Sequence, residues 1–169
     1  MVAVVLRLEA GGILVPAARR EVAARLRAAL RLLGRSRCQV TLLLTGDAEI
    51  RSLNLHYRKL DRATDVLSFH QQELRGETDP SGDGIFLGDL VISVQTALRR
   101  AGAKRLPGEL ARLAIHGLLH LFGHDHHRPA QAKVMRTLEN RLLRGTRACQ
   151  PRARSPTSVL AESLVREGS

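Results

Sequence analysis

The sequence contains few of the residues on which several protein classes depend. It has two cysteines, Cys38 and Cys149, no tryptophan, one tyrosine and three phenylalanines in 169 residues. Two cysteines cannot form a disulfide framework or a cysteine-rich zinc module. Four aromatic rings are too few for a platform on which many nucleic-acid bases stack. No apolar run approaches the roughly 18 residues that cross a bilayer, since the longest candidate, 113–123, contains two histidines.

The start of the chain also lacks the pattern of a secretory signal. Residues 1–9 hold a short apolar run followed by Arg7 and Glu9, with no basic start, long apolar stretch or small-residue cleavage site. We therefore expect a cytoplasmic, reducing environment and no membrane partner.

Charge of one sign is abundant. The chain has 27 Lys and Arg against 16 Asp and Glu, a formal net charge of +11, and such an excess favours an anionic partner. Many of the arginines fall between 19 and 37, where Arg20, Arg27 and Arg31 follow one another at helical spacings. Because arginine offers a planar fork that fits phosphate oxygens, these three are candidate substrate-binding residues. The alternative is that they simply form a solvated helix face.

Apolar periodicity predicts short strands that alternate with amphipathic helices. The expected strands are 2–8, 38–44, 64–69 and 85–92. The expected helices are 16–33, a helix with Thr45 as its N-cap, 93–101, 107–122 and a helix that begins at Pro129.

We expect the second helix to turn Ile50, Leu53 and Tyr57 inward, and the polar segment 70–84 to form a loop. The order of elements places the fold in the α/β or α+β class.

The predicted architecture is a small mixed sheet of about four strands flanked by about five helices. One domain, 1–144, accounts for these elements. Residues 145–169 are rich in Arg, Pro, Ser and Thr and are expected to form a basic, poorly ordered tail.

Five of the seven histidines lie within residues 116–127. His116 and His120 are one helical turn apart, so their rings project from the same face and form a natural pair of zinc ligands. Gly123 is a suitable helix stop, and a chain that turns back there can bring His126 to the same ion. Three nitrogen ligands leave a fourth position open, as in a catalytic zinc site.

Two details of this segment stay open. If the helix continued past Gly123, His124 would replace His126 in the ligand row. Asp125 either orients a metal ligand by a hydrogen bond or is only a turn residue before Pro129.

Gly117 follows the first histidine, where the familiar metalloprotease motif has a glutamate that acts as general base. Because that general base is missing, the sequence does not favour peptide hydrolysis as the activity.

The histidine segment reads H-G-L-L-H-L-F-G-H-D-H from His116 to His126. It resembles the signature H-G-x-L-H-L-x-G-Y/F-D-H of the YbeY family of single-strand-specific endoribonucleases. The one departure is His124, which stands where the family has an aromatic residue.

Two further blocks are similar to the same family. Residues 54–58 and 64–69 read N-L-H-Y-R and T-D-V-L-S-F, and residues 87–93 read L-G-D-L-V-I-S. The family patterns are N-x-x-Y/F-R, T-D-V-L-S-F and L-G-D-I-x-I-S. The resemblance covers about 4–143 in order and stops before the tail.

The resemblance implies a mixed sheet flanked by helices and one zinc ion per chain on His116, His120 and His126. It also implies that Arg58 matches the family's functional arginine. The implied activity is RNA cleavage in 16S rRNA processing, small-subunit maturation and ribosome quality control, with RNA as partner, no DNA, and possible ribosomal-protein or GTPase partners.

The mechanism expected from these residues has RNA in a basic groove, Arg58 on the scissile phosphate and His116 among the catalytic residues. The attacking group is either water or the ribose 2′-hydroxyl, and His124 and His127 are candidate general bases.

Two other functions compete with this reading. One is a non-catalytic ribosome-binding factor whose zinc is structural, and the other is a metal-dependent hydrolase of peptides or small molecules.

Overall fold

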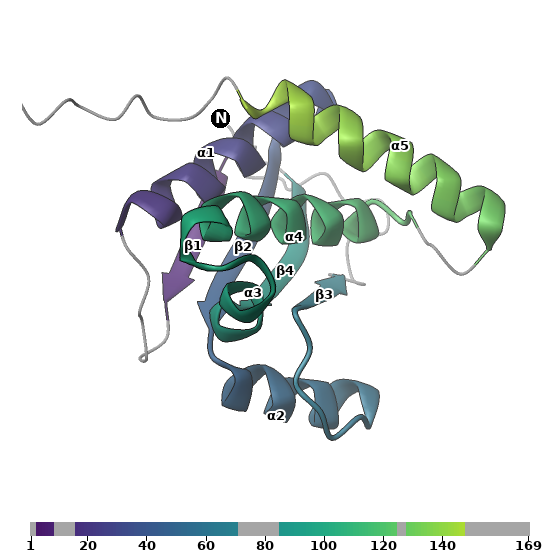
Figure 1. Ribbon diagram of the computed structural model, residues 1–169. Helices are drawn as coiled ribbons and strands as arrows, with labels where there is room; N and C mark the ends of the chain where they lie inside the picture. Colours follow the sequence, from purple (N-terminus) through teal and green to yellow (C-terminus); the bar gives the residue numbers. More distant parts are fainter. Residues whose placement is uncertain (1–2, 9–15, 71–84, 125–127, 148–169) are drawn as a thin grey trace, which may run out of the picture.

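A mixed four-stranded sheet organises the chain (Figure 1), which confirms the predicted fold class. The computed structural model describes residues 3–8, 16–70, 85–124 and 128–147. The strands lie in the order β1-β2-β4-β3, with β3 antiparallel at one edge and the others parallel. Their bounds are β1 Ala3–Leu8, β2 Cys38–Thr45, β3 Val66–His70 and β4 Ile85–Ser93.

Five α-helices and one short 3-10 turn lie in the described part of the chain. Their bounds are α1 Pro16–Leu32, α2 Asp47–Arg58, α3 Val94–Ala101, η1 Ala103–Arg105, α4 Leu106–Leu121 and α5 Pro129–Gly145. All five lie close to the predicted segments. Within the described ranges, no helix is both long and apolar enough to pass through a bilayer.

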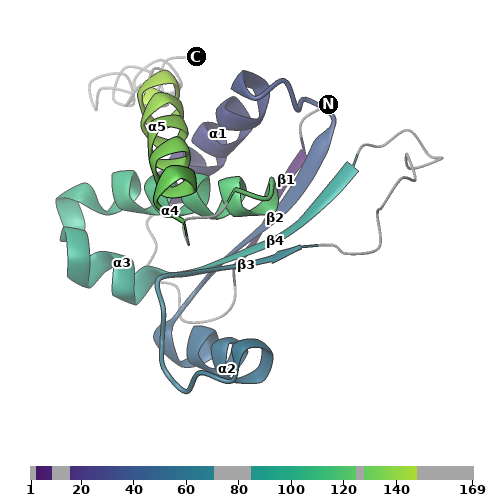
Figure 2. The same cartoon turned by 90° about the vertical axis from the view of Figure 1, so that its right-hand side faces the viewer.

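The helices divide between the two faces of the sheet (Figure 2). Helices α1 and α4 cover one face, α5 lies on the outer side of α4, and α2 covers the opposite face. Alternate residues of β4 serve the two sides: Leu90 and Ile92 belong to the large core under α1 and α4, whereas Val91 packs with Ile50 and Leu67 on the α2 side. Because successive side chains of a strand point to opposite faces of the sheet, β4 contributes residues to both hydrophobic cores.

Two local expectations about α2 are wrong. Its N-cap is Gly46 rather than Thr45, and the amide of Asp47 donates 2.8 Å to Oε1 of Gln95 on α3 instead of to a capping hydroxyl. Tyr57 does not point inward: it is 61% exposed, although its ring lies 4.8 Å from that of Phe69. The face of α2 that packs on the sheet is narrow, and Ile50 and Leu53 fill it.

The edge strand β3 reaches β4 at a very close backbone contact. Gly88 has φ +134°, and a Cβ added there would lie 2.0 Å from the carbonyl oxygen of Phe69. The β2–β4 register also shifts at this point, between Gln39 and Val40. A glycine is therefore required where β4 bends to receive β3.

Gly88→Ala is expected to lower the free energy of unfolding by about 3 kcal/mol or more, because backbone strain adds to the clash with Phe69. Gly34→Ala is the matched control, since Gly34 also has positive φ but nothing within 4 Å of an added Cβ; we expect about 1–2 kcal/mol there. Urea denaturation measures both, and equal losses would contradict the close contact as the cause.

Candidate metal centre

Helix α4 is apolar around most of its circumference because it packs against the sheet, α1 and α5 at once. Its fully buried leucines and isoleucine face these three neighbours. Two imidazoles interrupt that apolar surface, on His116 and His120, and both are partly buried. The predicted spacing of one turn is therefore realised on a rigid element.

The two rings face each other through the same nitrogen. Nε2 of His116 lies 3.2 Å from Nε2 of His120, and the ring centroids are 4.9 Å apart. Two nitrogens held at 2.0–2.1 Å by a tetrahedral zinc ion are roughly 3.3 Å apart. The donor pair therefore fits a divalent transition metal.

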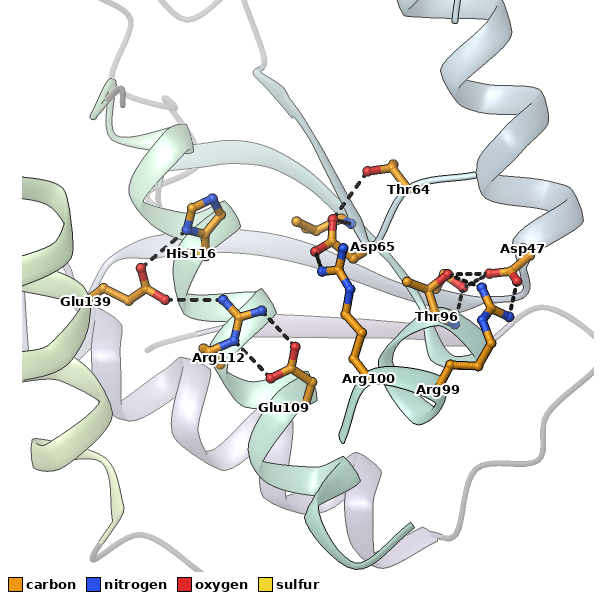
Figure 3. A network of polar contacts seen from close by, with 12 residues as sticks. Asp47, Thr64, Asp65, Thr96, Arg99, Arg100, Glu109, Arg112, His116 and Glu139 are labelled. Carbon is orange, nitrogen blue, oxygen red and sulfur yellow. Dashed lines mark hydrogen bonds and ion pairs between the residues drawn. The ribbon is translucent and has the colours of Figure 1, made fainter. Parts of the chain in front are cut away.

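A carboxylate stands behind the first ring (Figure 3). Nδ1 of His116 donates to Oε2 of Glu139 on α5 over 3.3 Å. A proton held on Nδ1 leaves Nε2 with its lone pair directed at the facing imidazole. This carboxylate–histidine arrangement is common behind the ligands of zinc sites, where it fixes the tautomer and the ring orientation.

Arg112 assists His116 in keeping Glu139 ionised. Its guanidinium lies 3.6 Å from Oε1 of Glu139 and forms two hydrogen bonds with Glu109 on its other side. Burial raises the pKa of the Glu139 carboxyl, but the hydrogen bond from His116 and the positive charge of Arg112 outweigh it and hold that pKa below its ordinary value. The ionised carboxylate therefore remains able to accept the hydrogen bond from Nδ1 of His116.

The helix ends where the sequence predicts. Gly123 has φ +79°, its amide donates to the carbonyl of His120, and the amide of His124 donates to the carbonyl of Leu119. These bonds form a Schellman motif, so the continuous ligand row that would have included His124 does not form. Residue 124 instead lines a small pocket of about 250 Å³ beside the start of α5.

The third predicted ligand, His126, lies outside the described residues, as do Asp125 and His127. Among the described residues, no group of three metal-binding side chains comes together. Of the three predicted ligands, the structure therefore describes His116 and His120.

Gly117 occupies the position at which the metalloprotease motif has its glutamate. An added Cβ there would lie 2.8 Å from Cδ2 of Leu90 and 3.3 Å from Cγ2 of Val66. This position faces the sheet rather than the histidine rings, so a side chain there would press on Leu90 and Val66 and would not reach the rings.

The end of the edge strand also reaches this helix terminus. Nε2 of His70 lies 2.7 Å from the carbonyl oxygen of His120. That carbonyl is one of the last of α4 and also accepts the amide of Gly123, so His70 contacts it as a second partner. The contact ties β3 to the end of the helix that bears the histidine pair.

The structure does not join Arg58 to the histidine pair. Arg58 is the exposed last residue of α2, which covers the opposite face of the sheet from α4. Within the described ranges, no hydrogen bond or ion pair engages its guanidinium. The guanidinium of Arg58 is therefore exposed and unpaired within the described part of the chain.

The predicted basic face of α1 lies along the other flank of α4. Arg20 and Arg31 are exposed and Arg27 is half-buried, while the apolar side of α1 packs on α4. Arg20 and Arg31 are thus open to solvent, and Figure 1 places α1 over β1 and β2 rather than beside β3.

Glu139, Arg112 and His70 were not identified from the sequence. A signal for Glu139 exists, because it lies four residues after Met135 and three before Leu142, both buried positions of α5. A carboxylate on the inward face of a helix needs a partner. Which partner it finds depends on how α5 lies on α4.

The fold and the paired imidazoles define a class: a small α/β protein with a candidate metal centre at the end of a buried helix. The chain belongs to the YbeY family, because the family model described as Endoribonuclease YbeY matches residues 15–147. Proteins named Endoribonuclease YbeY from Anaeromyxobacter dehalogenans and Moorella thermoacetica are each 46% identical to it.

The alignment with the Anaeromyxobacter protein spans 129 residues, 75% of this chain and 64% of that protein, and the Moorella alignment spans 63% and 72%. The chain thus spans a little under two thirds of the length of the Anaeromyxobacter relative. The solution structure of TM1509 from Thermotoga maritima shares the fold, with TM-score 0.54, 22% identity and coverage of 86% and 89%.

Glu139→Gln is expected to weaken zinc binding by about 10–100-fold, because an uncharged amide orients and polarises His116 less well. Competition with a chromophoric chelator measures the affinity. Glu49→Gln, an exposed carboxylate on α2, is the control and should leave the affinity unchanged. Equal affinities in the wild type and Glu139→Gln would contradict a role for the carboxylate behind the ring.

Proposed function

We propose that this chain is a metal-dependent endoribonuclease that cleaves single-stranded RNA during rRNA processing, including 16S rRNA maturation and ribosome quality control. The observation that carries the proposal is the facing Nε2 pair of His116 and His120, backed by Glu139, on a motif of the YbeY family. The relatives are named endoribonucleases, and the strongly basic chain suits an RNA substrate.

The proposed ligands of one zinc ion are His116, His120 and His126. Glu139 holds the first ring in the tautomer that presents Nε2, and Asp125 is proposed to orient one of the ligands. When bound, the metal supplies Lewis-acid polarisation of a phosphoryl group or activation of water. The Schellman turn at Gly123 gives the chain the reversal that a return of His126 requires.

Arg58 is the proposed clamp on the scissile phosphate, where its guanidinium stabilises the charge that develops in the transition state. Because Arg58 and the histidine pair belong to opposite faces of the sheet, the RNA has to cross the β3 edge to meet both. His70 lies at that edge, next to the end of α4. The exposed arginines of α1, Arg20 and Arg31, together with Arg27, are the proposed contacts for more distant phosphates.

The nucleophile is either water or the ribose 2′-hydroxyl, and the side chains of His124 and His127 are the candidate bases. In the cell we propose a cytoplasmic location and the small ribosomal subunit, with ribosomal-protein or GTPase partners, as the setting of the reaction.

The proposal is tested by assays of single-stranded RNA cleavage with wild type, His116→Ala and Arg58→Ala. We expect His116→Ala to abolish cleavage while RNA binding persists, and Arg58→Ala to lower kcat by about 10²–10³. Arg62→Ala is the matched control, an exposed arginine just beyond α2 that should change kcat little.

Cleavage by His116→Ala at the wild-type rate would contradict the enzymatic role and favour a binding factor with a structural metal. The product termini identify the nucleophile in the same assay, because a 2′,3′-cyclic phosphate requires attack by the 2′-hydroxyl.

A further inference from the structure

A second basic feature lies at the other end of α4. An open pocket of about 620 Å³ lies between the first turn of α4, the middle of α1, the last turn of α3 with η1, and the C-terminal end of α5. Six cationic side chains line it, against two carboxylates, Glu21 and Glu109. The cations are Arg25, Arg100, Lys104, Arg105, Arg112 and Arg147.

Half of these cations are not neutralised by the fold. Arg100 pairs with Asp65, and Arg112 pairs with Glu109 and Glu139. Lys104, Arg105 and Arg147 are exposed and form no ion pair with any residue that the structure describes. Their repulsion is relieved by an anion that enters the pocket.

Arg25 is built into the wall of the pocket. Its side chain is 6% exposed, and its buried Nε has no hydrogen-bond partner, although Oε1 of Glu21 lies 3.3 Å away. A buried donor without a hydrogen bond is costly. Arg25 is thus ion-paired with Glu21 while its Nε lacks a hydrogen bond, so the pocket wall holds a buried guanidinium that the fold satisfies only in part.

The backbone at the start of α4 adds to the positive electrostatic potential of the pocket. The pocket includes Pro107 and Gly108 at the start of α4, whose N-cap position, Arg105, provides no side-chain hydrogen bond. Pro107 has no N–H and the amide of Leu106 donates to Ala103, so the amide of Gly108 and the helix dipole are what favour an anion there. Nothing lies within 4 Å of a Cβ added at Gly108, so a ligand can approach this turn closely.

We propose that this pocket, lined by Lys104, Arg105, Arg25 and Arg147, binds phosphates of the RNA backbone at a point remote from the histidine pair. The inference rests on the proposed endoribonuclease function. Gly108 precedes His116 by eight residues, about 12 Å along the helix axis. Arg112 lies between the two sites and contacts the carboxylates at both (Figure 3), so one strand that follows α4 meets the pocket and the metal centre.

The test measures fluorescence anisotropy of a short single-stranded 2′-O-methyl RNA against the full chain over a range of salt concentrations. The double variant Lys104→Ala/Arg105→Ala is expected to bind about tenfold more weakly at low salt, with a salt slope smaller by about 1.4, since each lost phosphate contact on a single strand removes about 0.7. Lys133→Ala/Arg141→Ala, on exposed positions of α5 outside the pocket, carries the same charge change and should lose much less.

Equal binding and equal slopes for the two double variants would overturn the inference. Thermal stabilisation by inorganic pyrophosphate that the pocket variant loses, with unchanged RNA binding, would also overturn it, because the pocket would then take a free phosphate compound. Cleavage of unmodified RNA by the wild type separates the two claims: if the wild type cleaves while the double variants bind alike, the pocket assignment fails and the proposed function stands.

Discussion

The close seating of α4 on the sheet is the constraint on which the site depends. Gly117 allows the helix backbone to approach Leu90 and Val66, because any larger side chain would collide with them. His116 lies about 100° around the helix from Gly117, and its ring points toward α5, where Nδ1 contacts Glu139. The small size of Gly117 thus lets α4 lie close to the sheet while His116 and His120 share another face of the helix.

From that orientation a line of alternating charge runs along α4. Glu109, Arg112, Glu139 and His116 follow one another in contact, from the basic pocket at the start of the helix to the histidine pair near its end. Partly buried ion pairs of this kind keep their geometry better than solvated ones. Arg112 therefore links Glu139, behind the proposed metal ligand His116, to the proposed phosphate site.

The sequence predicts well what local geometry controls. The helix with His116 and His120 on one face follows from the 3.6-residue period, and its end at Gly123 follows from the backbone freedom of glycine. The N-cap at Thr45 and the inward position of Tyr57 are wrong because Gln95 and the narrow contact of α2 with the sheet decide them. Partners such as Glu139 come from another element, and periodicity within one helix carries no information about them.

The central claim is that three imidazoles hold one zinc ion and leave it a position for solvent or substrate. X-ray absorption at the zinc edge on the purified, zinc-loaded full chain tests it directly. The expected spectrum has three histidine nitrogens at about 2.0–2.1 Å and one further light-atom ligand. A sulfur shell at about 2.3 Å, four histidine nitrogens, or failure of the protein to retain zinc would contradict it.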